Sequence, residues 1–245
     1  MIWSLDKSTE VAARCHPLPI AASEPAKQWP GHPTKASTWN DRVIQPAIWP
    51  APSLQSSPDQ IMEFFQKELY TQAVAMVVSW GGMGRRSRDI YRQRSGEDIQ
   101  RIEKAIRFSA GSIRNSGSIS GAWTALTGKY DGELGWSAVM TSKTLHFLCR
   151  SLGFEDDPPV PIDNKVIRQI VWPKFRNSVL KGQRPAGWNG NTFAAYCRYM
   201  TAALIWAGPR GWTTTQMENT IFDEYLPKTP DLPCRISRFE ADSMI

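Results

Sequence analysis

The sequence contains few of the residues that bind metal ions or form disulfide frameworks. Its 245 residues include only four cysteines and three histidines, and Cys15, Cys149, Cys197 and Cys234 are too far apart to form a CxxC pair. Zinc ribbons and cysteine-ligated iron–sulfur clusters therefore lack sequence support, and we expect no metal and no other cofactor. The apolar neighbours of Cys149 and Cys197 indicate buried, reduced thiols, and His146 is expected to be a packed core residue.

Long apolar runs are also missing. Charged residues between Asp6 and Arg14 interrupt the first residues, so we expect neither a signal peptide nor a membrane span, and a cytoplasmic location. No phosphate-binding loop, dinucleotide fingerprint or metal-ligand motif occurs, which leaves a small-molecule enzyme without support. Alternating strand patterns and internal repeats are lacking as well, and a mainly α-helical protein is predicted.

The chain does carry a moderate excess of positive charge. Its 29 Lys and Arg residues against 23 Asp and Glu residues give a net charge of +6, which suits a polyanionic partner. Eight arginines lie between residues 85 and 114, and Arg85, Arg86 and Arg88 at their start fit a track for DNA phosphates. The acidic residues between them fit a solvated helix face equally well.

Residues 1–57 are expected to form an extended arm. Half of the 18 prolines occur in residues 1–58, where they disfavour helices, and tryptophans interleave with them. Disordered tails are poor in tryptophan, so the arm is predicted to pack on the main domain, with a flap over a substrate channel as the alternative.

Residues 58–245 are predicted to form one helical domain with two lobes. Ser57-Pro58-Asp59 begins a strong amphipathic pattern that runs to Gly81, which predicts one helix over residues 58–80. The other expected helices span residues 97–109, 118–126, 142–152, 164–172, 191–207 and 213–225.

Two residues able to carry chemistry begin neighbouring predicted helices. Thr141 and Ser142 are good N-cap residues, so Lys143 is expected in the first helical turn, where the helix dipole disfavours the ammonium and frees the amine as a nucleophile. Asp163 follows a proline-rich loop and would cap the next helix while one oxygen stays free. Taken singly, a capping aspartate and a lysine near a helix start are commonplace.

Taken together, the pair resembles the catalytic core of helix-hairpin-helix DNA glycosylases, in the 8-oxoguanine DNA glycosylase branch. There a lysine on the second hairpin helix precedes a Val-Pro-Val/Ile-Asp segment, matched here by Val160-Pro161-Ile162-Asp163, 20 residues after Lys143. Residues 196–200 and 216–222 also look like compact bacterial members of this fold, some of which occur in phage defence. The resemblance is good over residues 120–225, and it implies a catalytic hairpin region at about 120–175.

The expected hairpin departs from the family pattern. The family carries Gly-x-Gly before the lysine, whereas residues 138–142 contain no glycine and the nearest one is Gly135. Hydroxyls of Thr141 and Ser142 would then supply phosphate contacts. Further DNA contacts are expected from Lys165, Arg168 and Lys174.

The resemblance implies a mechanism without a cofactor, acting as a monomer on double-stranded DNA. Asp163 would stabilise the oxocarbenium-like sugar and accept a proton, while Lys143 would attack the anomeric carbon and form a Schiff base. Strand cleavage at the abasic site would follow as a second activity. A water activated by Asp163 would instead leave a plain abasic site.

The target nucleotide would have to be flipped into a pocket lined by aromatic and polar groups. The predicted pocket residues are Trp80, Gly81, Gly82, Met83, Trp136, Trp188, Asn189 and Trp212, although single tryptophans more often belong to the core. The resemblance to compact, defence-associated members implies a bulky modified cytosine, such as glucosylated hydroxymethylcytosine of phage DNA, and a role in anti-phage defence. The glycine-rich surroundings of Trp80 and Trp188 would leave room for such a base. The alternatives are 8-oxoguanine repair and a non-catalytic helical DNA-binding protein.

Overall fold

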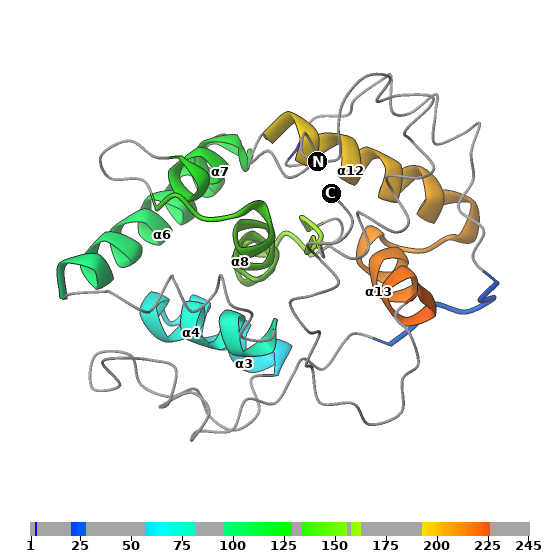
Figure 1. Ribbon diagram of the computed structural model, residues 1–245, viewed down its shortest axis with the longest axis horizontal. Coiled ribbons are helices and arrows are strands. Elements are labelled where there is room, and N and C mark those ends of the chain that lie inside the picture. The colour runs from blue at the N-terminus through cyan, green and yellow to red at the C-terminus, as the bar shows by residue number, and fades with distance from the viewer. Residues whose placement is uncertain are drawn as a thin grey trace, which may run out of the picture.

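The computed structural model describes residue 3 and residues 21–27, 57–81, 96–128, 134–155, 158–162 and 193–225. Every regular element in these residues is helical, which confirms the mainly α fold (Figure 1). The elements are α3 (Pro58–Gln66), α4 (Tyr70–Trp80), α6 (Gly96–Ser116), α7 (Ser120–Thr127), α8 (Ala138–Ser151), α12 (Phe193–Ala207), the 3-10 turn η2 (Gly208–Arg210) and α13 (Thr214–Tyr225). Within this described part, none of the helices has both the length and the apolar character that crossing a membrane demands.

The segment predicted as one helix over residues 58–80 forms two. Ser57 begins α3 with a capping box, in which its Oγ accepts from the Gln60 N–H at 3.2 Å and Gln60 Oε1 accepts from the Ser57 N–H at 3.3 Å. The chain then breaks at Glu68, whose φ of 56° lies in the left-handed region that a helix does not continue through. The break lets α4 fold back on α3 and become a central helix, with nine of its eleven residues buried.

Helix α8 is the centre of the first lobe. It packs against α3, α4, α6 and α7 (Figure 1). The side chains of Leu145, Phe147, Leu148 and Cys149 are all buried in the core that these helices share. Because each fully buried side chain of this kind stabilises the fold by about 1.5–3 kcal/mol, α8 is held rigidly along most of its length.

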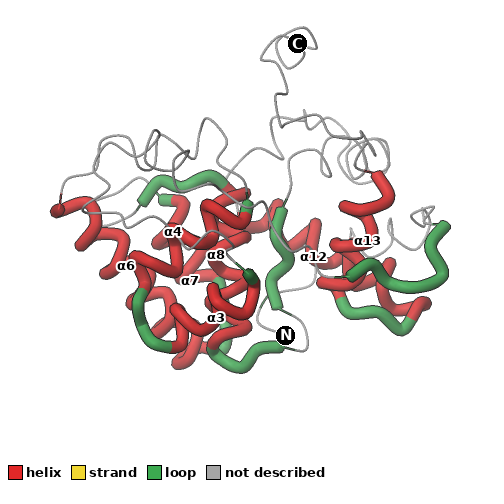
Figure 2. The backbone as a smooth tube through the Cα atoms, turned by 90° about the horizontal axis from the view of Figure 1, so that it is seen from below, coloured by secondary structure: helices red, strands yellow, loops and turns green. Residues whose placement is uncertain are grey.

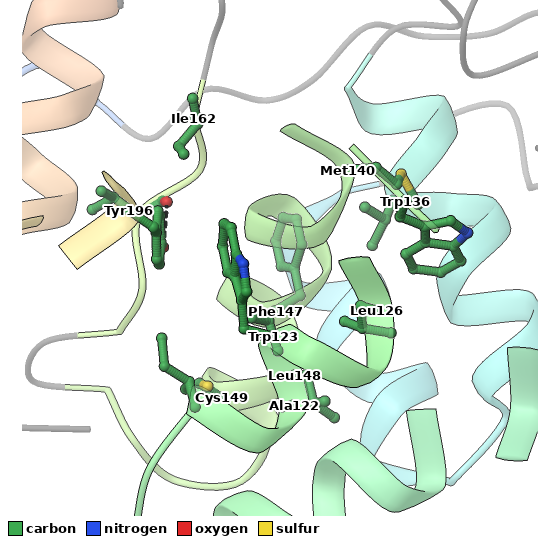
Figure 3. Packing of buried hydrophobic residues seen from close by; sticks show 14 of the residues in the cluster. Ala122, Trp123, Leu126, Trp136, Met140, Phe147, Leu148, Cys149, Ile162 and Tyr196 are labelled. Carbon is green, nitrogen blue, oxygen red and sulfur yellow. Dashed lines mark hydrogen bonds between the residues drawn. The ribbon is translucent and has the colours of Figure 1, made fainter. Parts of the chain in front are cut away.

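Helices α12 and α13 form the second lobe, seen as a separate group in Figure 2. The start of α13 is fixed by a reciprocal capping pair. The Gln216 N–H donates to Thr213 Oγ1 at 3.1 Å, and the Thr213 N–H donates to Gln216 Oε1 at 2.8 Å. The lobes meet where Trp123 of α7 stacks on Tyr196 of α12, with ring centroids 4.5 Å apart (Figure 3). These two groups of helices are the two lobes that the sequence predicts.

Residues 158–162, called the strap below, run between α8 and the second lobe (Figure 1). All five are buried. On one side the Tyr196 hydroxyl donates to the Val160 carbonyl oxygen at 2.8 Å, and the Val160 N–H lies 3.3 Å from the sulfur of Met200. The strap is therefore fixed to α12 by its backbone.

The N-terminal segment contacts the helical part at two described places. Trp3 is buried in the hydrophobic core, and the Ala26 N–H donates to Thr220 Oγ1 of α13 at 2.9 Å. The remainder of the predicted arm, apart from residues 21–27, lies outside the described residues, and the choice between a packed arm and a flap stays a prediction.

Candidate active site around Lys143

The turn between α7 and α8 sets the position of α8. The Leu134 N–H donates to the Ala125 carbonyl at 3.2 Å, and the Trp136 N–H donates to the Leu126 carbonyl at 2.7 Å. Between them Gly135 has a φ of 63°, a conformation that favours glycine. These contacts form a tight helical hairpin, in which Gly135 is the hairpin glycine.

Ser137, two residues after Gly135, is the N-cap of α8. Its Oγ accepts from the Met140 N–H at 3.3 Å. The prediction that Thr141 or Ser142 caps this helix is therefore wrong, and Lys143 lies in the second turn rather than the first. Because the helix dipole acts mainly on the first turn, it does not explain a free amine at Lys143.

The predicted phosphate contacts of Thr141 and Ser142 are also wrong. Both side chains have 0% of their surface exposed, so neither hydroxyl reaches a DNA backbone. Ser142 has a different role, because its Oγ accepts from the Ile162 N–H at 2.9 Å and donates to the Val139 carbonyl. This contact was not predicted from the sequence. The available signal was the spacing of Ser142 and His146, which are one helical turn apart and therefore lie on the same face of α8.

The side chain of Lys143 is half-buried and lies against the C-terminal end of α4. Its Nζ is 3.4 Å from the Gly81 carbonyl oxygen and 5.7 Å from the centre of the Trp80 ring. The Trp80 ring in turn meets Phe147 edge-to-face, with centroids 5.0 Å apart. Lys143 and Phe147 are one turn apart on α8, so both face the end of α4.

This packing corrects the prediction that Trp80 forms a substrate-pocket wall. Trp80 is only 7% exposed, and it packs against Phe147 and the Lys143 amine. It is therefore not open to a flipped base. Gly81 is half-buried, and a Cβ added to it would lie 2.9 Å from the Lys143 Nζ, so its place in a pocket wall stays a prediction.

The strap brings the residue before Asp163 to the neighbouring face of α8. Ile162 is buried, and its hydrogen bond to Ser142 fixes it beside the residue that precedes Lys143. Asp163 itself lies outside the described residues.

His146 holds the other end of the strap. Its Nδ1–H donates to the Pro159 carbonyl at 2.9 Å, and the ring is 2% exposed, which confirms a packed core histidine. Burial, with a smaller contribution from the positive charge of Arg150, lowers the pKa of His146 to about 3. The imidazole is therefore neutral at neutral pH and serves the strap as a hydrogen-bond donor.

We expect this buried histidine to destabilise the protein in acid. Its pKa is lower in the folded state than the unfolded value of about 6.5, so its contribution is complete above pH 6.5 and falls as the pH drops toward 3. Between pH 6.5 and 5 the loss is about 2 kcal/mol in the free energy of unfolding. Urea unfolding of wild type and His146→Asn at both pH values measures it, and parallel losses in the two proteins would contradict the prediction.

Neither of the other two described residues that were predicted to line the pocket joins this site. Trp136 is 2% exposed and belongs to the core, so it is not the wall of an open pocket. Trp212 is half-buried on the second lobe, with the Arg210 guanidinium 5.5 Å from its ring centre. The predicted residues outside the described part are Gly82, Met83, Arg85, Arg86, Arg88, Lys165, Arg168, Lys174, Trp188 and Asn189.

The described arginines of the basic segment favour the solvated-face interpretation. Arg107 of α6 contacts Glu68 at 2.9 Å and Glu103 at 3.4 Å, and Arg114 lies 3.9 Å from Glu68. Exposed ion pairs of this kind contribute little to stability. They do reduce the positive charge that this face offers to DNA.

The described cysteines are buried free thiols, as predicted. Cys149 and Cys197 form no disulfide, and burial raises the pKa of the Cys149 thiol. Among the residues described, no three His, Cys, Asp or Glu side chains gather as a metal site would require. The chemistry available at this site is that of an amine at the end of α4, on the helix to which the strap is bonded.

Comparison with known proteins identifies one family. The family model described as "Putative 8-oxoguanine DNA glycosylase OGG-like protein" matches residues 29–222, which is most of the chain and includes every described helix from α3 to α12. No curated protein and no solved structure gave a significant match.

Proposed function

Because the chain belongs to this OGG-like family of DNA glycosylases, we propose that it excises a modified base from DNA through Lys143 and Asp163. The observation that carries the proposal is the hydrogen bond from the Ile162 N–H to Ser142, the residue before Lys143. It anchors the residue preceding the acid next to the residue preceding the amine. A nucleophile and a carboxylate on one sugar are what base displacement requires.

The chemistry follows from these two groups. As the bond between the base and the sugar breaks, its electron pair leaves with the base, and positive charge develops on the anomeric carbon. The Asp163 carboxylate offsets this charge and takes the proton that frees the Lys143 amine. The amine then bonds to the anomeric carbon, and opening of the sugar ring gives a Schiff base. The released base, which carries the electron pair of the broken bond, then removes a proton from C2′ of this adduct. The 3′ phosphate leaves and the strand is cleaved.

The proposed substrate is a bulky modified cytosine such as glucosylated hydroxymethylcytosine, with a role in anti-phage defence. Trp80 no longer supports this choice, since it packs against Phe147 and the Lys143 amine. The support that remains is the resemblance to compact defence-associated members. The description of the matched family favours 8-oxoguanine as the second candidate.

One experiment separates these substrates. Duplexes carrying glucosylated hydroxymethylcytosine, 8-oxoguanine or no modification are incubated with the protein, and released bases are identified by mass spectrometry. We expect release of the modified cytosine at least ten times faster than release of 8-oxoguanine, a difference of about 1.4 kcal/mol in transition-state stabilisation. Release of 8-oxoguanine alone would reject the cytosine proposal and leave glycosylase activity standing.

A DNA-binding protein without catalysis is the remaining alternative. It predicts binding of all three duplexes with no free base from any of them. Trapping with borohydride, which reduces a Schiff base to a stable amine, reports on the lysine directly. An adduct with wild type therefore excludes the non-catalytic alternative.

A further inference from the structure

The C-terminal end of α4 surrounds the amine of Lys143 with groups from two successive residues. We propose that Gly81 and Trp80 are positioning residues, which fix the Lys143 amine for attack on the sugar. This inference rests on the proposed function, because it takes Lys143 as the nucleophile. It gives Trp80 a role in place of the pocket wall predicted from the sequence.

The first step of the argument is shape. Gly81 has φ −78° and ψ 1°, which any residue can adopt, so the backbone does not require glycine. The space does require it, because an added Cβ would lie 2.9 Å from the Nζ and 3.1 Å from the Cδ of Lys143. Only a residue without a side chain lets the lysine lie along the end of α4.

The second step is electrostatic. The carbonyl groups at the end of a helix carry partial negative charge, and the Gly81 oxygen lies 3.4 Å from the Lys143 Nζ. The negative face of the Trp80 ring lies on the same amine at 5.7 Å. Both groups attract an ammonium, so the resting amine is held at one place on α4.

The third step is the location of the Gly81 carbonyl and the Trp80 ring, which together are called the holder. Trp80 packs against Phe147 of α8, so the holder and the lysine belong to one rigid unit. On the neighbouring face of α8, Ser142 anchors the strap that leads to Asp163. The end of α4 thus contacts the amine of Lys143, while the strap is hydrogen-bonded to the residue before it. Displacing a reacting group by about 1 Å can cost about a hundredfold in rate.

Gly81→Ala tests the inference with little risk to the fold. The two atoms nearest to the added methyl group belong to the flexible Lys143 side chain, and the Val77 carbonyl oxygen follows at 3.3 Å, so the lysine moves and the helix adjusts only slightly. We expect borohydride trapping at saturating DNA to slow about tenfold to a hundredfold, with DNA affinity unchanged. The matched control is Gly111→Ala on α6, where an added Cβ meets no atom within 4 Å, and it should trap as wild type does.

A second measurement needs no DNA. Limited labelling with an amine-reactive reagent, followed by mass spectrometry, gives the modification rate of Lys143 relative to the other lysines. This rate should rise severalfold in Gly81→Ala, because the amine leaves its holder, and stay at the wild-type value in Gly111→Ala. Labelling and trapping both unchanged in Gly81→Ala would overturn the inference. Absence of any wild-type adduct would reject the proposed function instead, and the labelling result would still decide the positioning.

Discussion

Lys143→Ala is expected to abolish the adduct that borohydride traps between the protein and a duplex containing the modified base. No other described amine lies in the Gly81–Trp80 holder, and a methyl group cannot form a Schiff base. Base release should fall by at least about a hundredfold, since only water remains to attack the sugar. Gel separation of the reduced protein–DNA complex measures the adduct, and mass spectrometry measures the free base.

The matched control for this variant is Lys104→Ala. Lys104 is an exposed lysine of α6, and its removal takes away one positive charge without touching the site. It should form the adduct at the wild-type rate. A trapped adduct of undiminished yield in Lys143→Ala would show that another amine is the nucleophile, and the assignment of Lys143 would have to be given up.

Asp163→Asn is expected to lower base release by about a thousandfold while leaving DNA binding intact. The amide keeps the size of the carboxylate but carries no charge to offset the oxocarbenium-like sugar, and such electrostatic stabilisation contributes about 2.7–4 kcal/mol. It also cannot accept the proton of the Lys143 ammonium. Single-turnover base release at saturating protein isolates this effect from binding.

Asp223→Asn serves as the control for this second variant, because Asp223 is an exposed carboxylate on α13. The same charge change there should leave the single-turnover rate unaltered. Full activity of Asp163→Asn would remove the acid from the mechanism. Equal losses in both variants would show that the effect does not depend on the position of Asp163.

Local signals predicted the second lobe well. The three threonines at residues 213–215 predicted the start of α13, and the capping pair of Thr213 and Gln216 is the physical reason. Gly128 and Gly153 likewise predicted the ends of α7 and α8.

The break at Glu68 had no such signal, because the apolar pattern is continuous and the left-handed residue is not a glycine. The packing of α4 against α8 and α3 determines this break, and a local sequence pattern does not reveal such tertiary packing.

The sequence predicted which residue types form the candidate site but not its geometry. The catalytic role of Lys143 stays a prediction, and its helix is capped at Ser137 rather than at Thr141 or Ser142. Ser137, Thr141 and Ser142 are all acceptable N-caps, and the choice among them is made by the hairpin hydrogen bonds of residues 134 and 136 to α7. The glycine of Trp80-Gly81 was noticed as well. Its partner, a lysine 62 residues later, could be identified only in three dimensions.

The strap joins the two lobes through its main chain. Pro159 and Ile162 bind side chains of α8, whereas Val160 binds Tyr196 and Met200 of α12. A rotation of the second lobe would therefore pull on a short taut segment whose far end lies beside Lys143.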